Sequence, residues 1–164
     1  MIAELTTQES FGVLARTQLG RLACSKGMQP YVVPFYFAYQ GKCLYSFSMP
    51  GQKIDWMRAN PLVCVEADQM RREHWASVVV FGRYKELRDT EEMQSERALA
   101  VALLQKRPEW WKPGIEKIAP CCPTPAAAGA MAPVFYRIDI AKISGRRGGM
   151  QSGAPDNPRD STAY

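Results

Sequence analysis

The sequence contains little of what several protein classes require. No apolar run is long enough to span a bilayer, and the first residues lack the basic-then-apolar order of a signal peptide. We therefore expect a cytoplasmic protein with no membrane partner. The chain has a single histidine, His74, and none of its five cysteines forms a C-x-x-C motif. This excludes a histidine-rich metal centre, and no metal site is indicated.

The excess of basic residues is small. The chain has 21 Lys and Arg residues against 16 Asp and Glu residues, a formal net charge of +5. Apart from the Gly-Arg-Arg run at 145–147, the basic residues are scattered, whereas a nucleic-acid-binding protein gathers them on one face among aromatic residues. We therefore expect no nucleic-acid partner. The same charge suits small anionic molecules, especially phosphates.

The cysteines and the histidine have ordinary interpretations. Cys24, Cys43 and Cys64 stand in strand-like apolar runs, where a free thiol behaves as a small hydrophobic residue. Cys121 and Cys122 are adjacent, and we expect a pair of loop thiols, with a redox role as the alternative. His74 is expected to be an exposed or hydrogen-bonded bystander, so no catalytic role is assigned to it.

Length and composition predict one domain over residues 1–147 and a disordered tail over residues 148–164, which is rich in Gly, Pro, Ser and Asp. One helix is predicted from a cap at Thr6 or Thr7 to a stop at Gly20. A second is predicted to open at Asp89, with Glu92 in capping-box spacing. Runs of β-branched and aromatic residues predict six strands, at 21–25, 31–39, 42–47, 62–67, 75–87 and 133–143.

Six strands joined mostly by short connections predict a mainly β chain with a few helices (α+β). We expect an antiparallel six-stranded barrel rather than a parallel βαβ sheet. Pro34 interrupts the second strand and cannot donate to a ladder hydrogen bond. That point is therefore an edge, a bulge or a place where something other than a strand approaches. The interruption indicates a split, incompletely closed barrel.

The stretch YSFSMPGQKIDWMRANP, residues 45–61, begins like a strand and ends like a short helix. If the helix begins near Gly51, its first N–H groups are unpaired and carry partial positive charge. The ammonium of Lys53 and the hydroxyls of Ser46 and Ser48 would then form an anion site suited to phosphate. The alternative is that Ser48 caps the helix, the Pro-Gly pair only turns the chain and Lys53 is a solvated surface charge.

The longer stretch LYSFSMPGQKIDWMRANPLVCVEAD resembles the signature of the FMN-binding split-barrel family related to pyridoxamine 5′-phosphate oxidase. The resemblance continues in GRLACSKGMQPYVVPFYFAYQGK and in WASVVVFGRYKEL, and covers about residues 5–147. FYRIDIAKISGR resembles the closing strand of the subgroup that includes the nitroimidazole-resistance proteins.

This resemblance implies that Lys53 binds the phosphate of FMN, with Ser46 and Ser48 beside it. It implies homodimers with the flavins in the subunit interface, so that some contacts come from the partner chain. Trp75 is explained equally well as an anchor of the dimer interface or as a flavin contact. Without the resemblance, Ser77 is best explained as a buried strand residue whose hydroxyl bonds to the backbone. The cofactor-binding residues expected on this basis are Val33, Pro34, Phe35, Tyr36, Ser46, Ser48, Gln52, Lys53, Trp75 and Ser77.

Two departures from the family pattern matter. Gln52 stands where many relatives carry Arg or His, which lowers the charge available to the phosphate. The last residues contain no Trp or His, unlike the segment with which true pyridoxamine-phosphate oxidases grip their substrate. We therefore do not expect vitamin B6 oxidation.

The function expected from the resemblance is an FMN-dependent oxidoreductase. It would move electrons from NADH or NADPH through FMN to a small acceptor, for which the subgroup suggests a nitroaromatic compound. No side chain is assigned a catalytic role, because the flavin carries the chemistry. Trp110 and Trp111 would either line the pocket or pin the loop around them. The alternatives are a flavin carrier or sensor, a haem-binding split-barrel protein, and a cofactor-free module whose basic tail contacts an acidic partner.

Overall fold

The computed structural model describes residues 1–71, 74–106 and 132–149. Among these residues it has three helices, with a 3₁₀ turn (Glu91–Met93) before the last: α1 (Thr7–Arg16), α2 (Gln52–Ala59) and α3 (Gln94–Gln105). The strands are β1 (Ile2–Leu5), β2 (Leu19–Lys26), β3 (Gln29–Tyr36), β4 (Ala38–Gln40), β5 (Cys43–Ser48), β6 (Leu62–Met70), β7 (His74–Glu86) and β8 (Val134–Gly149).

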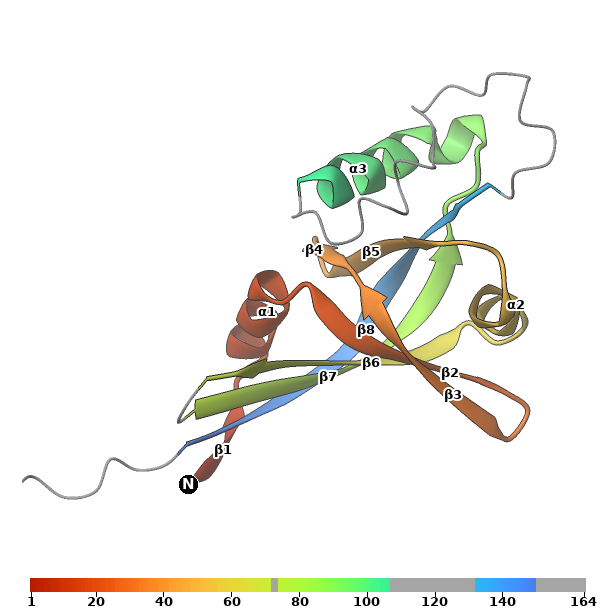
Figure 1. Ribbon diagram of the computed structural model, residues 1–164. Coiled ribbons are helices and arrows are strands. Elements are labelled where there is room, and N and C mark those ends of the chain that lie inside the picture. Colours follow the sequence, from red (N-terminus) through yellow and green to blue (C-terminus); the bar gives the residue numbers. More distant parts are fainter. Residues whose placement is uncertain (72–73, 107–131, 150–164) are drawn as a thin grey trace, which may run out of the picture.

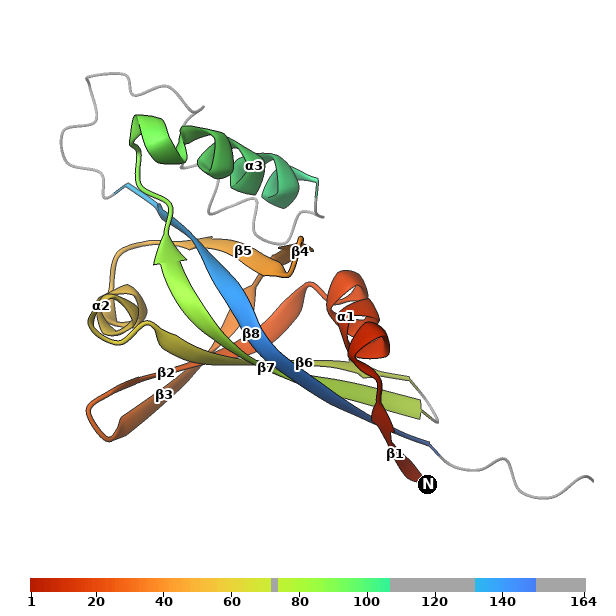
Figure 2. The same ribbon diagram turned by 180° about the vertical axis from the view of Figure 1, so that it is seen from behind.

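All of these strands belong to one antiparallel sheet in the order β3-β2-β6-β7-β8-β5-β4, and β1 pairs with β8. The sheet curves around a core but does not close, because β3 and β4 are its two end strands. Figures 1 and 2 show α1 and α2 on opposite sides of this open barrel and α3 across β4 and β5. The predicted antiparallel split barrel with a few helices is confirmed.

The core follows from the two-residue period of the strands. On β2, Leu22 and Cys24 are buried, whereas their neighbours Arg21 and Ala23 face outward. Val13, Leu14, Ile54 and Met57 add the buried faces of α1 and α2 to the same cluster. A second, smaller cluster packs Ala100 and Leu104 of α3 against Ala38, Tyr45, Leu87 and Phe135.

The strand count differs from the prediction, with eight strands rather than six among the described residues. The run predicted at 31–39 is divided into β3 and β4 at Phe37, whose N–H donates to the carbonyl of Gln18 and whose side chain is fully buried. β1 was not predicted, because its residues are mostly exposed and it is held by pairing with the distant β8.

Both helix predictions need correction at one end. α1 is capped at Thr6, one of the two predicted residues, and a capping box that was not predicted forms there, with Thr6 accepting from the N–H of Glu9 and Glu9 accepting from that of Thr6. However, α1 ends at Arg16, and Gly20 lies in β2, where a Cβ would stand 2.5 Å from the carbonyl oxygen of Glu66. Glycine is used there for the close approach of β6, not as a helix stop.

The helix predicted to open at Asp89 begins later. Thr90 precedes the 3₁₀ turn, which is closed by the N–H of Met93 donating to the Thr90 carbonyl. No side-chain hydrogen bond caps this turn or α3, so the predicted Asp89–Glu92 capping box does not form.

Pro34 lies on an end strand of the sheet and is exposed, so of the three alternatives the structure selects an edge. The Gly-Arg-Arg run at 145–147 belongs to β8, which continues to Gly149. The rest of the predicted tail lies outside the described residues, as do Trp110, Trp111, Cys121 and Cys122. Cys24, Cys43 and Cys64 are free thiols on strands, as predicted. No helix in the described part of the chain has the length and apolarity needed to cross a membrane.

Candidate functional site

The start of α2 is open. The N-cap residue is Gly51, and no side chain accepts a hydrogen bond from the first turn. Ser48 therefore does not cap the helix, which removes one part of the alternative interpretation. A Cβ at Gly51 would meet nothing within 4 Å among its surroundings. The first N–H groups of α2 are consequently accessible to an acceptor from outside the chain.

α2 is held firmly behind this open end. Ile54 and Met57 are fully buried in the core. Arg58 donates from Nε and Nη2 to the two carboxylate oxygens of Glu86 on β7, at 2.7 and 2.9 Å. Asn60, after the last turn, donates to Ser25 Oγ of β2 at 3.1 Å. The first turn of α2 is therefore fixed relative to the sheet, because the helix is attached to two different strands.

Lys53, in this first turn, is not a solvated surface charge. Its side chain is partly buried, and this burial lowers the pKa of the ammonium group; the nearby thiol of Cys24 opposes the shift. None of the ion pairs among the described residues includes Lys53. Its cationic form has lost part of its hydration without gaining a carboxylate, an unfavourable state that an anionic ligand would relieve.

Two hydroxyl groups lie in the barrel interior, where the Cys24 thiol interacts electrostatically with both Lys53 and Tyr136. Ser46 is buried on β5 and donates to the carbonyl oxygen of Tyr36 at 2.6 Å. Its cross-strand neighbour is Tyr136 of β8, which is fully buried. Burial raises the pKa of Tyr136, an effect that Ser46 opposes and Cys24 reinforces. The Tyr136 hydroxyl lies close to that of Ser46, which itself donates to the Tyr36 carbonyl, and it makes no well-aligned hydrogen bond with the described residues.

These features fit an anionic group with oxygen acceptors. Lys53 supplies a charge without a counter-ion in the described part of the chain, and α2 supplies unpaired N–H groups. Ser48 follows Ser46 on the same face of β5 and is only partly buried, so it stands toward the α2 end of this group. Gln52 is exposed as the first residue of α2. The arrangement can bind a phosphate.

The predicted residues of β3 divide between two faces. Val33 is partly buried, and Phe35 is buried and stacked on Phe37 with ring centroids 5.2 Å apart. Pro34 points outward. Tyr36 reaches the interior group through its carbonyl oxygen, which accepts from Ser46. The strand therefore touches the candidate site through its backbone at Tyr36.

Within one chain, Trp75 and Ser77 do not lie near Lys53 and the start of α2. Trp75 stands at the opposite end of β7 from Glu86, eleven residues away (86 − 75), roughly 35 Å along a strand. Ser77 is partly buried and donates to Glu66 at 2.9 Å, so a side chain and not the backbone satisfies it. Any contact of Trp75 or Ser77 with a ligand at α2 must come from another copy of the chain.

The contact between Arg58 and Glu86 yields a prediction about stability. The side chain of Glu86 is only 18% exposed, and Arg58 is the first cause, before Tyr84, of its lowered pKa. Replacing Arg58 with methionine should lower the free energy of unfolding by about 1 kcal/mol at neutral pH, since Arg58 itself is half-exposed. Because the pKa of Glu86 is lower in the folded protein than its ordinary value of 4.5, the ionised carboxylate stabilises the fold at any pH above 4.5. This stabilisation is lost as the pH falls through the lowered pKa.

Urea unfolding of the wild type and of Arg58→Met, at pH 7 and again below pH 4.5, measures the loss of stability. The difference in free energy of unfolding between the two proteins should be smaller in acid. Asp55→Asn is a matched control, because it breaks the exposed 3.8 Å contact of Arg58 and leaves the contact with Glu86 in place; it should change stability by a few tenths of a kcal/mol. Equal losses in the two variants would show that the Glu86 contact does not anchor α2.

Sequence reasoning missed four residues of this site: Cys24, Arg58, Glu86 and Tyr136. Tyr136 and Cys24 follow the apolar periodicity of their strands, so both resemble ordinary core residues. Arg58 and Glu86 are 28 positions apart, and only the register of β7 against α2 brings them together. Asn60 and Pro61 lie within the stretch that carries the family resemblance, and the hydrogen bond from Asn60 to Ser25 gives Asn60 a structural role.

Comparison with known proteins agrees with the fold. A family model described as pyridoxamine 5′-phosphate oxidase matches residues 6–147. An uncharacterized protein of Rhizobium meliloti (strain 1021) is 45% identical over 143 residues, which cover 87% of this chain and 92% of that protein.

Solved structures show the same likeness. A FAD-binding protein from Mesorhizobium loti is 41% identical, with a TM-score of 0.73 over 91% of this chain and 99% of its own. A candidate 5-nitroimidazole antibiotic resistance protein from Bacteroides thetaiotaomicron has a TM-score of 0.65 over 90% of this chain and 89% of its own, and at 15% identity it shows the shared fold alone. The chain belongs to the pyridoxamine 5′-phosphate oxidase family.

Proposed function

We propose that this protein is a flavin-dependent oxidoreductase that holds the flavin phosphate at the start of α2. The observation that carries the proposal is the partly buried Lys53 ammonium, which has no carboxylate partner among the described residues. The 41% identical Mesorhizobium loti protein, described as FAD-binding, supports a flavin as the ligand. FMN and FAD carry the same phosphate on the ribityl chain, so the site suits either, and FMN is our first expectation.

The chain's own residues would bind and orient the cofactor. Lys53 and the first N–H groups of α2 would neutralise the phosphate, and the partly buried hydroxyl of Ser48 would add a further donor. When bound, a flavin supplies two-electron transfer, here from NADH or NADPH to a small acceptor such as a nitroaromatic compound. The apolar interior around Phe35 would exclude water from one side of the site. No side chain is required as a nucleophile.

We propose further that the active form is a homodimer. The outward face of the sheet carries exposed apolar side chains on four adjacent strands: Leu19, Val32, Leu62 and Phe81. The register aligns Val32, Ala23, Cys64 and Phe81 in one row across β3, β2, β6 and β7. A continuous apolar row of this kind is typical of an interface. Trp75 and Ser77 belong to the same face, where they could reach a flavin held by the partner.

The test begins with the cofactor. Protein purified without added flavin, or titrated with FMN and FAD, should bind one flavin per chain and turn yellow. NADH or NADPH, added without oxygen, should bleach the bound flavin, and a nitroaromatic compound should restore its absorbance. Binding without bleaching would favour a carrier or sensor over an enzyme. A haem spectrum, or failure to bind any flavin, would contradict the proposal.

A further inference from the structure

Arg146, near the end of β8, lies on the outer face of the sheet. In the register of β7 against β8 it is paired with Ser77, and Gly148 is paired with Trp75. Successive residues of a strand point to opposite faces, and Val78 is fully buried on the core face, so Trp75 and Ser77 lie on the outer one. Arg146 therefore shares a face with the two residues that the proposed dimer brings to the partner's flavin.

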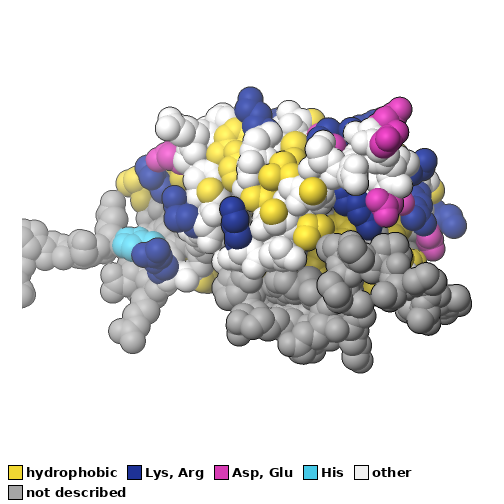
Figure 3. Space-filling view, turned by 90° about the horizontal axis from the view of Figure 1, so that it is seen from above, with side chains coloured by type: hydrophobic (Ala, Val, Ile, Leu, Met, Phe, Trp, Pro, Cys, Tyr) yellow, Lys and Arg dark blue, Asp and Glu magenta, His cyan; other side chains and the backbone are white. Residues whose placement is uncertain are grey.

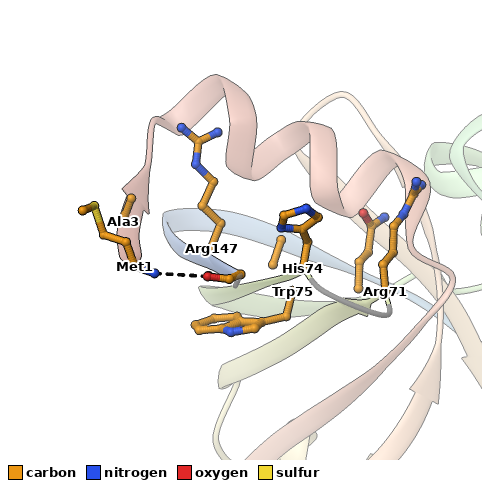
Figure 4. Close-up of a pocket in the computed structure, with 10 residues that line it drawn as sticks. Met1, Ala3, Arg71, His74, Trp75 and Arg147 are labelled. Atoms are coloured by element: carbon orange, nitrogen blue, oxygen red, sulfur yellow. Dashed lines mark hydrogen bonds between the residues drawn. The ribbon is translucent and has the colours of Figure 1, made fainter. Parts of the chain in front are cut away.

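The next arginine along the chain, Arg147, lies on the opposite face of the sheet. Its guanidinium contacts Glu9 of α1 at 3.0 Å. Figure 4 shows Arg147 and His74 rising toward α1, with the indole of Trp75 on the other side of the strands. Two successive arginines thus carry their charges to opposite faces, so that Arg147 is a matched control for Arg146.

The charge of Arg146 has no partner in the described part of the chain. Its side chain is exposed, and none of the ion pairs among the described residues includes it. Two acidic residues nearby on this face are already bonded: Glu66 accepts from Ser77 at 2.9 Å, and Asp68 accepts from an arginine of β2 at 2.9 Å. Glu4, the exposed cross-strand neighbour of Arg146 on β1, forms no ion pair with it. The guanidinium can therefore bind an acceptor from outside the chain.

An aromatic ring lies beside this charge. A Cβ at Gly148 would stand 2.6 to 2.8 Å from three atoms of the Trp75 indole, so the absence of a side chain there lets the ring lie against the backbone of β8. Gly148 is two residues beyond Arg146 and faces the same way. The indole, the Ser77 hydroxyl and the guanidinium thus form one patch near the start of β7. Figure 3 shows the chain's single histidine, His74, which begins this strand, at one end of the molecule.

We propose that Arg146 contacts the ring of the flavin held by the partner chain and raises its reduction potential. The inference rests on the proposed function, in which Lys53 of one chain holds the phosphate and the outer face of the other chain meets the ring. Hydride transfer from NADH or NADPH brings two electrons and one proton to the ring and leaves it with one negative charge, while the nicotinamide is oxidised. A guanidinium beside the ring stabilises this charged form more than the neutral oxidised form.

Loss of the contact should lower the potential without removing the flavin. Arg146→Met should weaken the binding of reduced FMN about tenfold more than that of oxidised FMN, which lowers the midpoint potential of the bound flavin by about 30 mV. Arg146→Lys keeps the positive charge and should stay close to the wild type. Arg147→Met removes the same side chain from the other face and should leave the potential unchanged. Anaerobic titration against a dye of known potential, on dimers isolated by gel filtration, measures all four proteins.

A mixed dimer tests whether Arg146 acts from the partner chain. Chains with Lys53→Ala and chains with Arg146→Met are combined, and the mixed dimers are isolated through two different affinity tags. If each site joins Lys53 of one chain to Arg146 of the other, every mixed dimer has one intact site, which should bind FMN with wild-type affinity and potential. A lowered potential in the occupied site would place Arg146 beside the flavin of its own chain and overturn the inference.

The potentials and the flavin affinities fail separately. An unchanged potential in Arg146→Met, or an equal decrease in Arg147→Met, overturns the role of Arg146, while normal FMN binding leaves the proposed function standing. Failure of the wild type to bind any flavin overturns the proposed function itself.

Discussion

Lys53→Ala should weaken FMN binding by about 30-fold, because one charge-assisted contact with a phosphate is worth about 2 kcal/mol. The fold should survive the change. Burial lowers the pKa of Lys53, which means that the protonated amine opposes folding in the unliganded protein. The free energy of unfolding should therefore change by less than about 1 kcal/mol, the lost packing of the lysine stem being offset by relief of the buried charge. Fluorescence titration and urea unfolding measure the two quantities.

Lys26→Ala is the matched control for this variant. Lys26 is exposed at the end of β2, so its removal alters the net charge equally without touching the site. The control should bind FMN as the wild type does. Similar losses in the two variants would point to a general effect of charge, and an unchanged affinity in Lys53→Ala would place the phosphate elsewhere.

Phe81→Glu should convert the proposed homodimer into monomers. Phe81 is 51% exposed on the outward face of β7, in the apolar row with Cys64 and Val32. A carboxylate buried without a partner at an interface costs several kcal/mol, which raises the dimer dissociation constant by about 100-fold or more. Light scattering after gel filtration should then give the mass of one chain, 18.4 kDa. Flavin affinity should fall as well, because in the proposed dimer Trp75 and Ser77 would reach the flavin from the partner chain.

Phe81→Leu keeps the apolar character of the position and serves as the control. It should remain dimeric and bind flavin as the wild type does. If Phe81→Glu stays dimeric, this face is not the interface. If it becomes monomeric but keeps its flavin affinity, the flavin site is complete within one chain and the proposed role of the partner is wrong.

The parts of the fold that could be predicted depend on neighbours in the sequence. The alternation of Leu22 and Cys24 with outward residues predicts a strand, and a cap at Thr6 or Thr7 predicts the start of α1. Pro34 predicts an interruption of the ladder, as an edge, a bulge or the approach of something other than a strand, because the missing donor is a property of the residue itself. Local patterns of this kind are present in the sequence before any tertiary contact forms.

The missed features depend on contacts between distant segments. Gly20 resembles a helix stop, and only the approach of the Glu66 carbonyl shows why glycine is needed there. β1 has little apolar periodicity and exists because it pairs with β8. In the site, the sequence predicts Lys53 and Ser46 but not Tyr136, because the cross-strand pairing of β5 with β8 is not visible in either strand alone.

The central claim is that the start of α2 binds the phosphate of a flavin. It is tested most directly by comparing FMN with riboflavin, which lacks only that phosphate, in the wild type and in Lys53→Ala. We expect the wild type to bind FMN at least about 30-fold more tightly than riboflavin, and we expect most of this preference to disappear in the variant while riboflavin affinity is unchanged. Equal affinities of the wild type for the two flavins, or a preference that persists without Lys53, would contradict the claim.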